Sequence, residues 1–357
     1  MHFVAKKDGE RRMVQNYHHI NQWMVKNGYP LPLIADILDG VEKRKVFTKL
    51  DLRWGYNNVR IKEGDEWKAA FTMHIRAYKP TVMYFRLTNS SATFQTMMND
   101  LFRDLINQED TAIFINDILV AIDTEEGHDE LVEEVLRRLE ENNLFVKLEK
   151  CKWKVREVEF LGVVIGLKGV EMQKEKVKGV LNWLAPRNIK EVQKFLDLAN
   201  YYRRFIKNFA RIAVPLHALV RKEQKWKWEK EQEEVFGKLK AVFTMEPVLA
   251  IPDIDREIRV EADASDYATG GVLSAKCEGG KWRPVAFISK LLNTMECNYE
   301  IHDKEMLAVI RCLEAWRHYL EGAKLEFEIW TNHKNLQYFM TSQKLNRRQA
   351  RWALYLS

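Results

Sequence analysis

The sequence predicts an α+β protein of two or three domains. A chain of 357 residues is long enough for two or three domains, each with its own core. Short runs of β-branched and aromatic residues alternate with longer stretches of helical periodicity. From about residue 251, the predicted order of strand, strand, strand, helix, strand, helix is typical of an α+β domain with a mixed sheet.

The first 166 residues are expected to mix strands and helices. The predicted elements are, in order, a strand at 45–50, a helix at 95–106, strands at 112–115 and 118–122, a helix at 128–142 and a strand at 158–166. Only Asn116 and Asp117 separate the two middle strands, which is the spacing of a tight hairpin with a polar tip.

The rest of the chain is expected to divide near residue 250. Residues 167–250 are helical and basic in pattern, with Pro186 and Pro215 as breaks. After residue 251, strands are predicted at REIRVEADAS, GGVLSAK, PVAFISK and KLEFEIW, with a helix at 302–320 and a last helical segment near the end of the sequence.

Composition limits the class of protein. There are 57 Lys and Arg against 51 Asp and Glu, and the resulting net charge of +6 permits an anionic partner without identifying one. The four cysteines form no CxxC pair, which argues against a zinc ribbon or a disulfide framework. Without a membrane-length apolar run or a signal-peptide pattern, the expectation is a soluble cytoplasmic or nuclear chain that is not secreted and binds no membrane.

Four carboxylates stand where metal-ion chemistry would need them. Asp51 ends a predicted strand, Asp117 lies at the hairpin tip, Asp263 follows a strand, and Glu305 lies early in a helix. Phosphodiester chemistry with two metal ions uses carboxylates that converge from rigid elements. Each of these residues, taken alone, also fits a turn, a cap or a helix surface, so both interpretations stand at this point.

Eleven ordered segments carry a resemblance to a known family. They are KKDG (6–9), NGYPLP (27–32), TKLDLRWGYNNVRIKEGD (48–65), LTNSSATFQTMMND (87–100), DILV (117–120), VEFLGVVI (158–165), LANYYRRFIKNFARIAVPL (198–216), VEADASDYATGGVLS (260–274), DKEMLAVI (303–310), WRHYLEG (316–322) and LNRRQARW (345–352). From end to end the chain resembles the reverse transcriptase–ribonuclease H polyprotein of gypsy-type long-terminal-repeat retrotransposons.

The resemblance implies a right-hand polymerase fold followed by a ribonuclease H-like domain. Fingers and palm would occupy residues 1–166, thumb and connection 167–250, and the ribonuclease H-like domain 251–357. The pattern is already under way at residue 1, so the fingers are expected to be incomplete, and the nuclease domain to be truncated at its C-terminal end. The implied cofactors are two Mg²⁺ or Mn²⁺ ions in each active site.

The resemblance also implies roles for single residues. Asp51 and Asp117 would be palm metal ligands, and Asp263 and Glu305 nuclease metal ligands. The residues implied to bind nucleotide or template are Lys6, Arg12, Tyr56, Phe85 and Gln95. The residues implied to contact nucleic acid from the thumb are Tyr202, Arg203, Arg204 and Lys207, although Tyr201 and Phe205, four residues apart, could instead face a core.

Several residues depart from the family pattern. Asn116 and Asn332 stand where the family has catalytic aspartates, and Arg86 stands where it has glycine. Asn16 likewise replaces an aspartate, and Asp197 a glycine. Each of these changes can arise from one G-to-A or C-to-T change in a codon, which suggests a degenerate copy; codons that require other base changes at these positions would refute that origin.

The expected function follows from the resemblance and its departures. It is RNA-directed DNA polymerase with ribonuclease H activity, working by two-metal phosphoryl transfer and impaired in this copy. The alternative is a catalytically inactive remnant, a pseudoenzyme that still binds nucleic acid. The implied partners are an RNA or DNA template-primer, an RNA–DNA hybrid, deoxynucleoside triphosphates, and the protease and integrase segments of an intact element.

Overall fold

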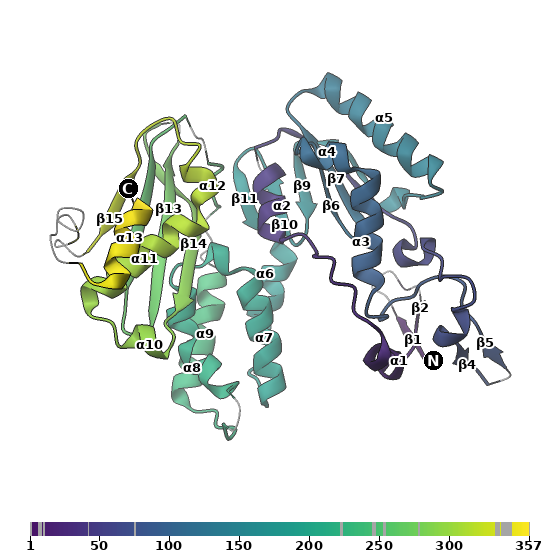
Figure 1. Ribbon diagram of the computed structural model, residues 1–357, viewed down its shortest axis with the longest axis horizontal. Coiled ribbons are helices and arrows are strands. Elements are labelled where there is room, and N and C mark those ends of the chain that lie inside the picture. The colour runs from purple at the N-terminus through teal and green to yellow at the C-terminus, as the bar shows by residue number, and fades with distance from the viewer. Residues whose placement is uncertain are drawn as a thin grey trace. The chain divides into compact units, whose positions relative to one another are not determined.

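The computed structural model describes most of the chain and divides it into two compact units. The described residues are 2–5, 9, 11–41, 43–74, 76–221, 224–244, 248–252, 255–277, 279–332, 336 and 345–356. Unit 1 comprises Met1–Leu161 with Ile165–Leu167, and unit 2 comprises Gly162–Val164 with Lys168–Ser357. Both units combine helices with antiparallel sheets, which confirms the α+β class (Figure 1).

A four-stranded sheet is the centre of unit 1. Its strands are β3 (Val46–Asp51), β6 (Thr111–Phe114), β7 (Asp117–Ile122) and β8 (Lys152–Val155), in the order β6-β7-β3-β8. Helices α3 (Ser90–Leu101) and α5 (Glu125–Glu141) bury apolar side chains in the same core as this sheet. The predicted strand at 45–50, the hairpin and the helix at 128–142 are therefore confirmed, with small shifts of their ends.

The other elements of unit 1 are short. They are β1 (His2–Ala5), β2 (Arg11–Val14), α1 (His18–Trp23), α2 (Ile34–Val41), η1 (Gly55–Asn58), η2 (Glu66–Ala69), β4 (Phe71–Thr72), β5 (Ala77–Tyr78), α4 (Arg103–Asn107), η3 (Leu148–Lys150) and β9 (Glu157–Phe160). The helix expected at 95–106 is two helices, α3 and α4, because Phe102 leaves helical geometry with φ −120° while its side chain is fully buried.

The strand expected at 158–166 is also interrupted. Strand β9 ends at Phe160, and β10 (Val163–Gly166) begins three residues later. Between them, Leu161 and Gly162 have φ values of 46° and 82°, so the backbone turns where the sequence predicted a continuous strand. The expectation of one strand was wrong, because positive φ at a leucine leaves no signal in an apolar run.

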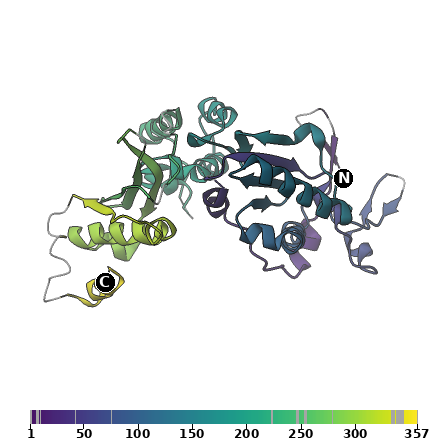
Figure 2. The same cartoon turned by 90° about the horizontal axis from the view of Figure 1, so that it is seen from above.

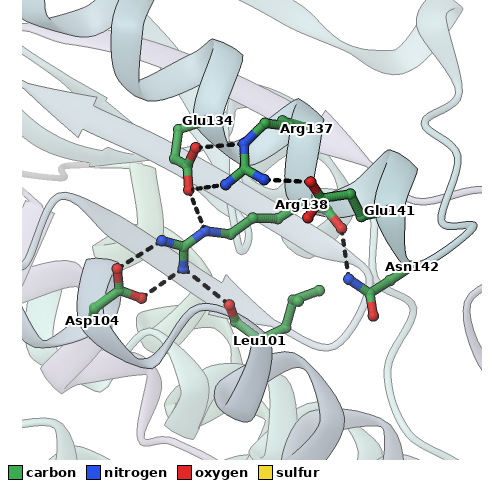
Figure 3. A network of polar contacts seen from close by, with 7 residues as sticks. All are labelled: Leu101, Asp104, Glu134, Arg137, Arg138, Glu141 and Asn142. Atoms are coloured by element: carbon green, nitrogen blue, oxygen red, sulfur yellow. Dashed lines mark hydrogen bonds and ion pairs between the residues drawn. The ribbon is translucent and has the colours of Figure 1, made fainter.

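An ion pair between Arg138 and Asp104 joins α5 to α4 (Figure 3). Arg138 donates to both carboxylate oxygens of Asp104 at 2.6 and 2.7 Å, and to Glu134 at 2.6 Å. A fourth bond from Arg138 reaches the carbonyl oxygen of Leu101 at 3.1 Å, at the end of α3. These hydrogen bonds to Arg138 hold the pKa of Asp104 at about 2.

Unit 2 begins with a small strand and a group of helices. They are β11 (Gly169–Met172), α6 (Lys174–Leu181), α7 (Ile189–Tyr201), η4 (Arg203–Phe205), α8 (Phe209–Leu219) and α9 (Lys230–Thr244). The helical character expected for 167–250 is confirmed from α6 onward. Pro186 lies between two helices as expected, whereas Pro215 lies inside α8 and does not end it.

The second half of unit 2 is a mixed sheet covered by helices. The strands are β12 (Ile258–Ala264), β13 (Ala268–Lys276), β14 (Trp282–Leu291) and β15 (Glu328–Thr331), ordered β14-β13-β12-β15 with β12 and β15 parallel. Helix α11 (Ile301–Ala315) packs along one face (Figure 2). The remaining helices are α10 (Thr294–Cys297), α12 (Arg317–Leu320) and α13 (Arg347–Leu356). The predicted mixed sheet is confirmed.

Candidate polymerase and nuclease centres

Two of the predicted carboxylates of unit 1 lie opposite each other. In the antiparallel register of β3 and β7, Asp51 pairs with Asp117. Directly opposed residues of such a pair place their side chains on the same face of the sheet, about 5 Å apart at Cβ. Asp117 is the first residue of β7, so the turn of the hairpin is formed by Ile115 and Asn116 and not by Asn116 and Asp117.

The electrostatics of this pair combine burial with nearby cations. Burial raises the pKa of Asp51, and Asp117 raises it further, while Lys150 lowers it. The ammonium group of Lys49, two residues before Asp51, lies 3.5 Å from Oδ1 of Asp117. Two carboxylates close enough to disfavour each other's charge are arranged to accept a cation.

Asn116 lies beside the pair and is half-buried, with its Oδ1 atom turned away from solvent. Its Oδ1 atom has no hydrogen-bond partner among the described residues. A Cβ atom on Gly55 would lie only 2.1 Å from that oxygen, so a glycine is required there for the amide to fit. Two carboxylates and an unsatisfied amide oxygen fit a divalent cation, but with one negative charge fewer than three carboxylates would supply.

Gln95 supports the hairpin from inside the core. Its side chain is 0% exposed, its Nε2 donates to the carbonyl of Ile113 at 3.1 Å, and its Oε1 accepts from the backbone of Ile115 at 2.8 Å. The side chain of Gln95 does not reach the surface here, and its expected contact with template or nucleotide stays a prediction. Gln95 fixes the backbone just before Asn116.

Tyr56 and Phe85 form an aromatic pair. Their ring centroids are 4.9 Å apart in an edge-to-face arrangement, and the hydroxyl of Tyr56 is 2.9 Å from Oγ of Ser91. Tyr56 is buried, whereas Phe85 is half-buried. Arg86 follows directly, with an exposed side chain and a φ of 76°. This is the left-handed region that favours glycine.

The structure describes little of the two basic residues expected to bind nucleotide from the fingers. Lys6 lies outside the described residues. Arg12 belongs to β2, where its backbone pairs with that of Val4, and its side chain is not among those described.

A second group of acidic residues lies at one end of the sheet in unit 2. Asp263 belongs to β12, and Glu305 lies in α11 with only 5% of its surface exposed. Burial raises the pKa of Glu305, and the charge of Asp263 raises it further. Thr331, the last residue of β15, donates to Glu305 Oε2 at 3.4 Å. The structure thus brings together the two predicted nuclease carboxylates.

Asn332 completes this group in an unexpected way. Its Nδ2 donates to Oδ1 of Asp263 at 3.2 Å. An amide nitrogen therefore occupies one of the carboxylate lone-pair positions that a metal ion would use, and fits a metal less well than a third carboxylate would. Across the described ranges there is no cluster of three or more His, Cys, Asp or Glu side chains that could hold a metal ion.

A cavity of about 290 Å³ adjoins Asp263 and Asn332. On one side it is lined by Lys207 and Asn208, which immediately precede α8, and on the other by the sheet residues, including Trp330. Gly270 of β13 permits this approach, because a Cβ there would lie 2.7 Å from Oδ1 of Asn208. Asn208 and Trp330 have no signal in the sequence, because their positions depend on the packing of distant segments.

Comparison with known proteins decides the family. Residues 4–165 match the model of reverse transcriptase (RNA-dependent DNA polymerase), and residues 253–357 match that of the RNase H-like domain found in reverse transcriptase. The chain belongs to the reverse transcriptase–ribonuclease H family of long-terminal-repeat retrotransposon polyproteins. Polymerases and nucleases of this kind work with divalent metal ions.

Its similar relatives include retrotransposon polyproteins of Schizosaccharomyces pombe (strain 972 / ATCC 24843). The Transposon Tf2-3 polyprotein and the Transposon Tf2-7 polyprotein are each 37% identical to it over 356 residues, which is 99% of this chain. The chain spans 27% of the length of these relatives.

Solved foamy viral protease–reverse transcriptase structures share the fold. One, described as dRH and in complex with double-stranded DNA, matches with a TM-score of 0.82, covering 99% of this chain and 62% of its own. Another, in complex with RNA/DNA hybrid, matches with a TM-score of 0.75, covering 99% and 48%. At 24% identity these matches show the fold alone, and the two family models give the order of a reverse transcriptase domain followed by an RNase H-like domain.

The four residues expected to contact nucleic acid from the thumb differ in their exposure and in their hydrogen bonds. Tyr202 is 1% exposed and donates from its hydroxyl to the carbonyl of Gly162 at 2.9 Å, and its expected contact with nucleic acid stays a prediction. Arg203 donates to the carbonyl of Ser289 in β14, and burial lowers its pKa. Arg204 is half-buried, and Lys207 alone of the four is exposed.

The alternative core interpretation of this segment holds for one residue only. Phe205 is buried, but Tyr201 is 39% exposed. The helix α7 ends at Tyr201, so the four-residue spacing does not place both rings on one helix face.

No helix in the part of the chain that the structure describes is both long and apolar enough to cross a membrane.

Proposed function

We propose that this chain is organised for RNA-directed DNA synthesis and for hydrolysis of RNA in an RNA–DNA hybrid, with both activities impaired in this copy. The supporting observation is common to both centres. Each keeps two carboxylates, Asp51 with Asp117 and Asp263 with Glu305, and has an asparagine beside them. The family's sequence pattern has a third aspartate at each of those asparagines.

The residues that would hold Mg²⁺ or Mn²⁺ are the two carboxylates of each centre. When bound, the ions supply Lewis-acid stabilisation of charge on the reacting phosphate. The chain's own contribution is positioning: Gln95 fixes the hairpin backbone, and the β3–β7 register fixes the spacing of Asp51 and Asp117. Tyr56 and Phe85 offer a rigid aromatic pair near them, suited to excluding a ribose 2′-hydroxyl.

The impairment is argued from charge. An amide oxygen is a neutral ligand, so Asn116 lowers the negative charge that recruits and holds a divalent cation. Removing one charged contribution from such a centre costs several kcal/mol of transition-state stabilisation, or roughly 10³-fold in rate. At the nuclease centre, the Asn332–Asp263 hydrogen bond competes directly with metal ligation.

The proposed organisation has three parts. Residues 1–166 would form fingers and palm, 167–250 thumb and connection, and 251–357 the ribonuclease H-like domain. The proposed partners are a template-primer, an RNA–DNA hybrid and deoxynucleoside triphosphates, together with the protease and integrase segments of an intact polyprotein. The foamy viral structures in complex with double-stranded DNA and with RNA/DNA hybrid support this choice of nucleic acid.

Primer extension tests the proposal. The chain should extend an annealed primer on an RNA template very slowly, and Asn116→Asp combined with Arg86→Gly should restore extension by roughly 10³-fold. The matched control is Asn107→Asp, which changes the charge in the same way at an exposed residue of α4, away from Gln95 and the hairpin. Unimpaired extension by the original chain, or no gain in the double variant, contradicts the proposal.

The second candidate is a catalytically inactive protein that binds nucleic acid. The Asn332–Asp263 hydrogen bond favours it, because a centre satisfied by its own side chains has less use for a cation. Filter binding to an RNA–DNA hybrid over a salt series tests it. A linear fall of log affinity with log salt concentration supports this candidate, and absence of binding at low salt refutes it.

A further inference from the structure

We propose that the cavity beside Trp330 is a binding site for one unpaired nucleotide, with the base stacked on the indole and the phosphate paired with Lys207. The inference rests on the proposed nucleic-acid function and identifies a site within it. The cavity shares Asp263 and Asn332 with the nuclease centre, but the proposed contacts need no metal ion, so binding is measured without one.

The face of the sheet that carries the site lies opposite α11. In β12, Val260 and Ala262 lie in the core with α11, so the alternating residues Arg259, Glu261 and Asp263 face the other way. Trp330 pairs with Glu261 in the parallel register of β12 and β15, and therefore lies on this same face.

Trp330 is exposed but held in place. Its side chain is 52% exposed, and its ring nitrogen donates to Glu328 at 2.9 Å. The guanidinium of Arg259 lies 3.7 Å from the centroid of the Trp330 ring and 4.0 Å from that of Trp282. An indole fixed by a cation on one side is a prepared surface for stacking, and loses little freedom when a base binds.

Lys207 supplies the matching cation. It is exposed at the rim of the cavity and makes no ion pair with any described residue, so its charge is available to a phosphate. Asp263 and Glu261 on the floor would repel a phosphate, which directs it toward the Lys207 side. A cavity of about 290 Å³ is small among ligand pockets, and suits one nucleotide better than a duplex.

The site is assembled from two segments that are far apart in the sequence. Backbone N–H of Ala210, in the first turn of α8, donates to the buried Oγ of Ser289 at 2.8 Å. Arg203 bonds to the carbonyl of the same serine. These contacts anchor the start of α8 on β14, and so set Lys207 at a fixed distance from the sheet residue Trp330.

The test is fluorescence anisotropy of the full chain with a short single-stranded oligothymidylate and an abasic oligonucleotide of equal length, in EDTA. Trp330→Ala should weaken oligothymidylate binding about tenfold, the size expected for one stacked base, and leave abasic binding unchanged. Trp330→Phe should keep most of the affinity, and Trp330→Leu should behave like the alanine variant. Tyr355→Ala, an exposed aromatic on α13, is the control and should change nothing.

Lys207→Gln should weaken both oligonucleotides and reduce the slope of log affinity against log salt by about 0.7, whereas Lys238→Gln on α9 should not. Equal binding of the base-containing and abasic oligonucleotides, or unchanged binding by Trp330→Ala, overturns the site. Loss of all binding by the unsubstituted chain refutes the proposed nucleic-acid function instead, so the two failures are distinguishable.

Discussion

Arg86 illustrates how one residue can bear a structural cost. Its φ of 76° lies in the left-handed region, where side chains with a Cβ cost roughly 1–2 kcal/mol. Asn21 holds this turn from both sides: its Nδ2 donates to the carbonyl of Arg86 at 2.7 Å, and its Oδ1 accepts from the backbone of Thr88 at 3.0 Å. The turn conformation is therefore fixed by its surroundings, and arginine is strained within it.

We expect Arg86→Gly to stabilise unit 1. Relief of the backbone strain outweighs the greater chain entropy of glycine, leaving a net gain of roughly 0.5–1 kcal/mol. The urea midpoint of unfolding measures it. Arg76→Gly, at an exposed arginine whose φ is not positive, should be neutral or destabilising. A destabilised Arg86→Gly variant would show that the arginine side chain has a compensating contact.

Asn332 gives a prediction that does not depend on activity. Replacing it by aspartate removes the hydrogen bond to Asp263 and sets two carboxylates beside Glu305. Without divalent ions we expect Asn332→Asp to lower stability by about 1 kcal/mol, and Mg²⁺ to restore it. Thermal unfolding with and without Mg²⁺ tests this, against a parent chain that should respond little. An identical response to Mg²⁺ in both proteins counts against a self-satisfied centre.

At the scale of elements, Arg138 connects α3, α4 and α5. Its guanidinium donates two hydrogen bonds to Asp104, one to Glu134 and one to the carbonyl of Leu101. Little of its donor capacity is left unused. Among the residues that the structure describes, its neighbour Arg137 bonds only to Glu134 and Glu141 on the same helix. Arg138 therefore contributes to the packing of elements, and Arg137 to one helix.

A double-mutant cycle between Arg138→Gln and Asp104→Asn should give a coupling of roughly 0.5–1 kcal/mol at neutral pH, given the exposure of Asp104. The pKa of Asp104 is lowered to about 2, so the coupling is fully present above the usual aspartate pKa. It should be lost as the pH falls toward 2. The same cycle with Arg137→Gln should give no coupling, and a pH-independent coupling would contradict the assignment.

The elements that could be predicted are those with a local signal. The apolar runs of β3, β6 and β7 and the two polar residues between the last two indicated the hairpin, and the register then placed Asp51 opposite Asp117. The turn at Leu161 could not be predicted, because a leucine with positive φ is imposed by its surroundings.

The burial of Tyr202 beside the exposed Tyr201 was equally invisible. Two adjacent tyrosines have the same local pattern, whereas in the structure Tyr202 bonds to Gly162 and packs against Phe205 and Phe243. Trp330 has no local signal at all, because Arg259 stacks on it from a strand some 70 residues earlier in the sequence. The site was therefore predictable in its carboxylates, but not in the aromatic and thumb residues around them.

At the scale of the whole molecule, charge and catalysis are linked. The Asp-to-Asn departures at both centres, together with Arg86, make the chain more positive than the family pattern would. A more positive chain attracts nucleic acid at least as well, while under the proposed function each centre would hold its metal ions less tightly. We therefore expect this protein to bind a template-primer while its catalytic turnover is slow.

Single-turnover nucleotide incorporation tests this separation most directly, with the template-primer Kd measured on the same samples. Comparing Arg86→Gly with Arg86→Gly plus Asn116→Asp isolates the one carboxylate at issue. The account predicts a rise of roughly 10³-fold in the incorporation rate with Kd changed less than about threefold. Equal rates in the two proteins, or a gain that comes entirely from tighter template-primer binding, would contradict it.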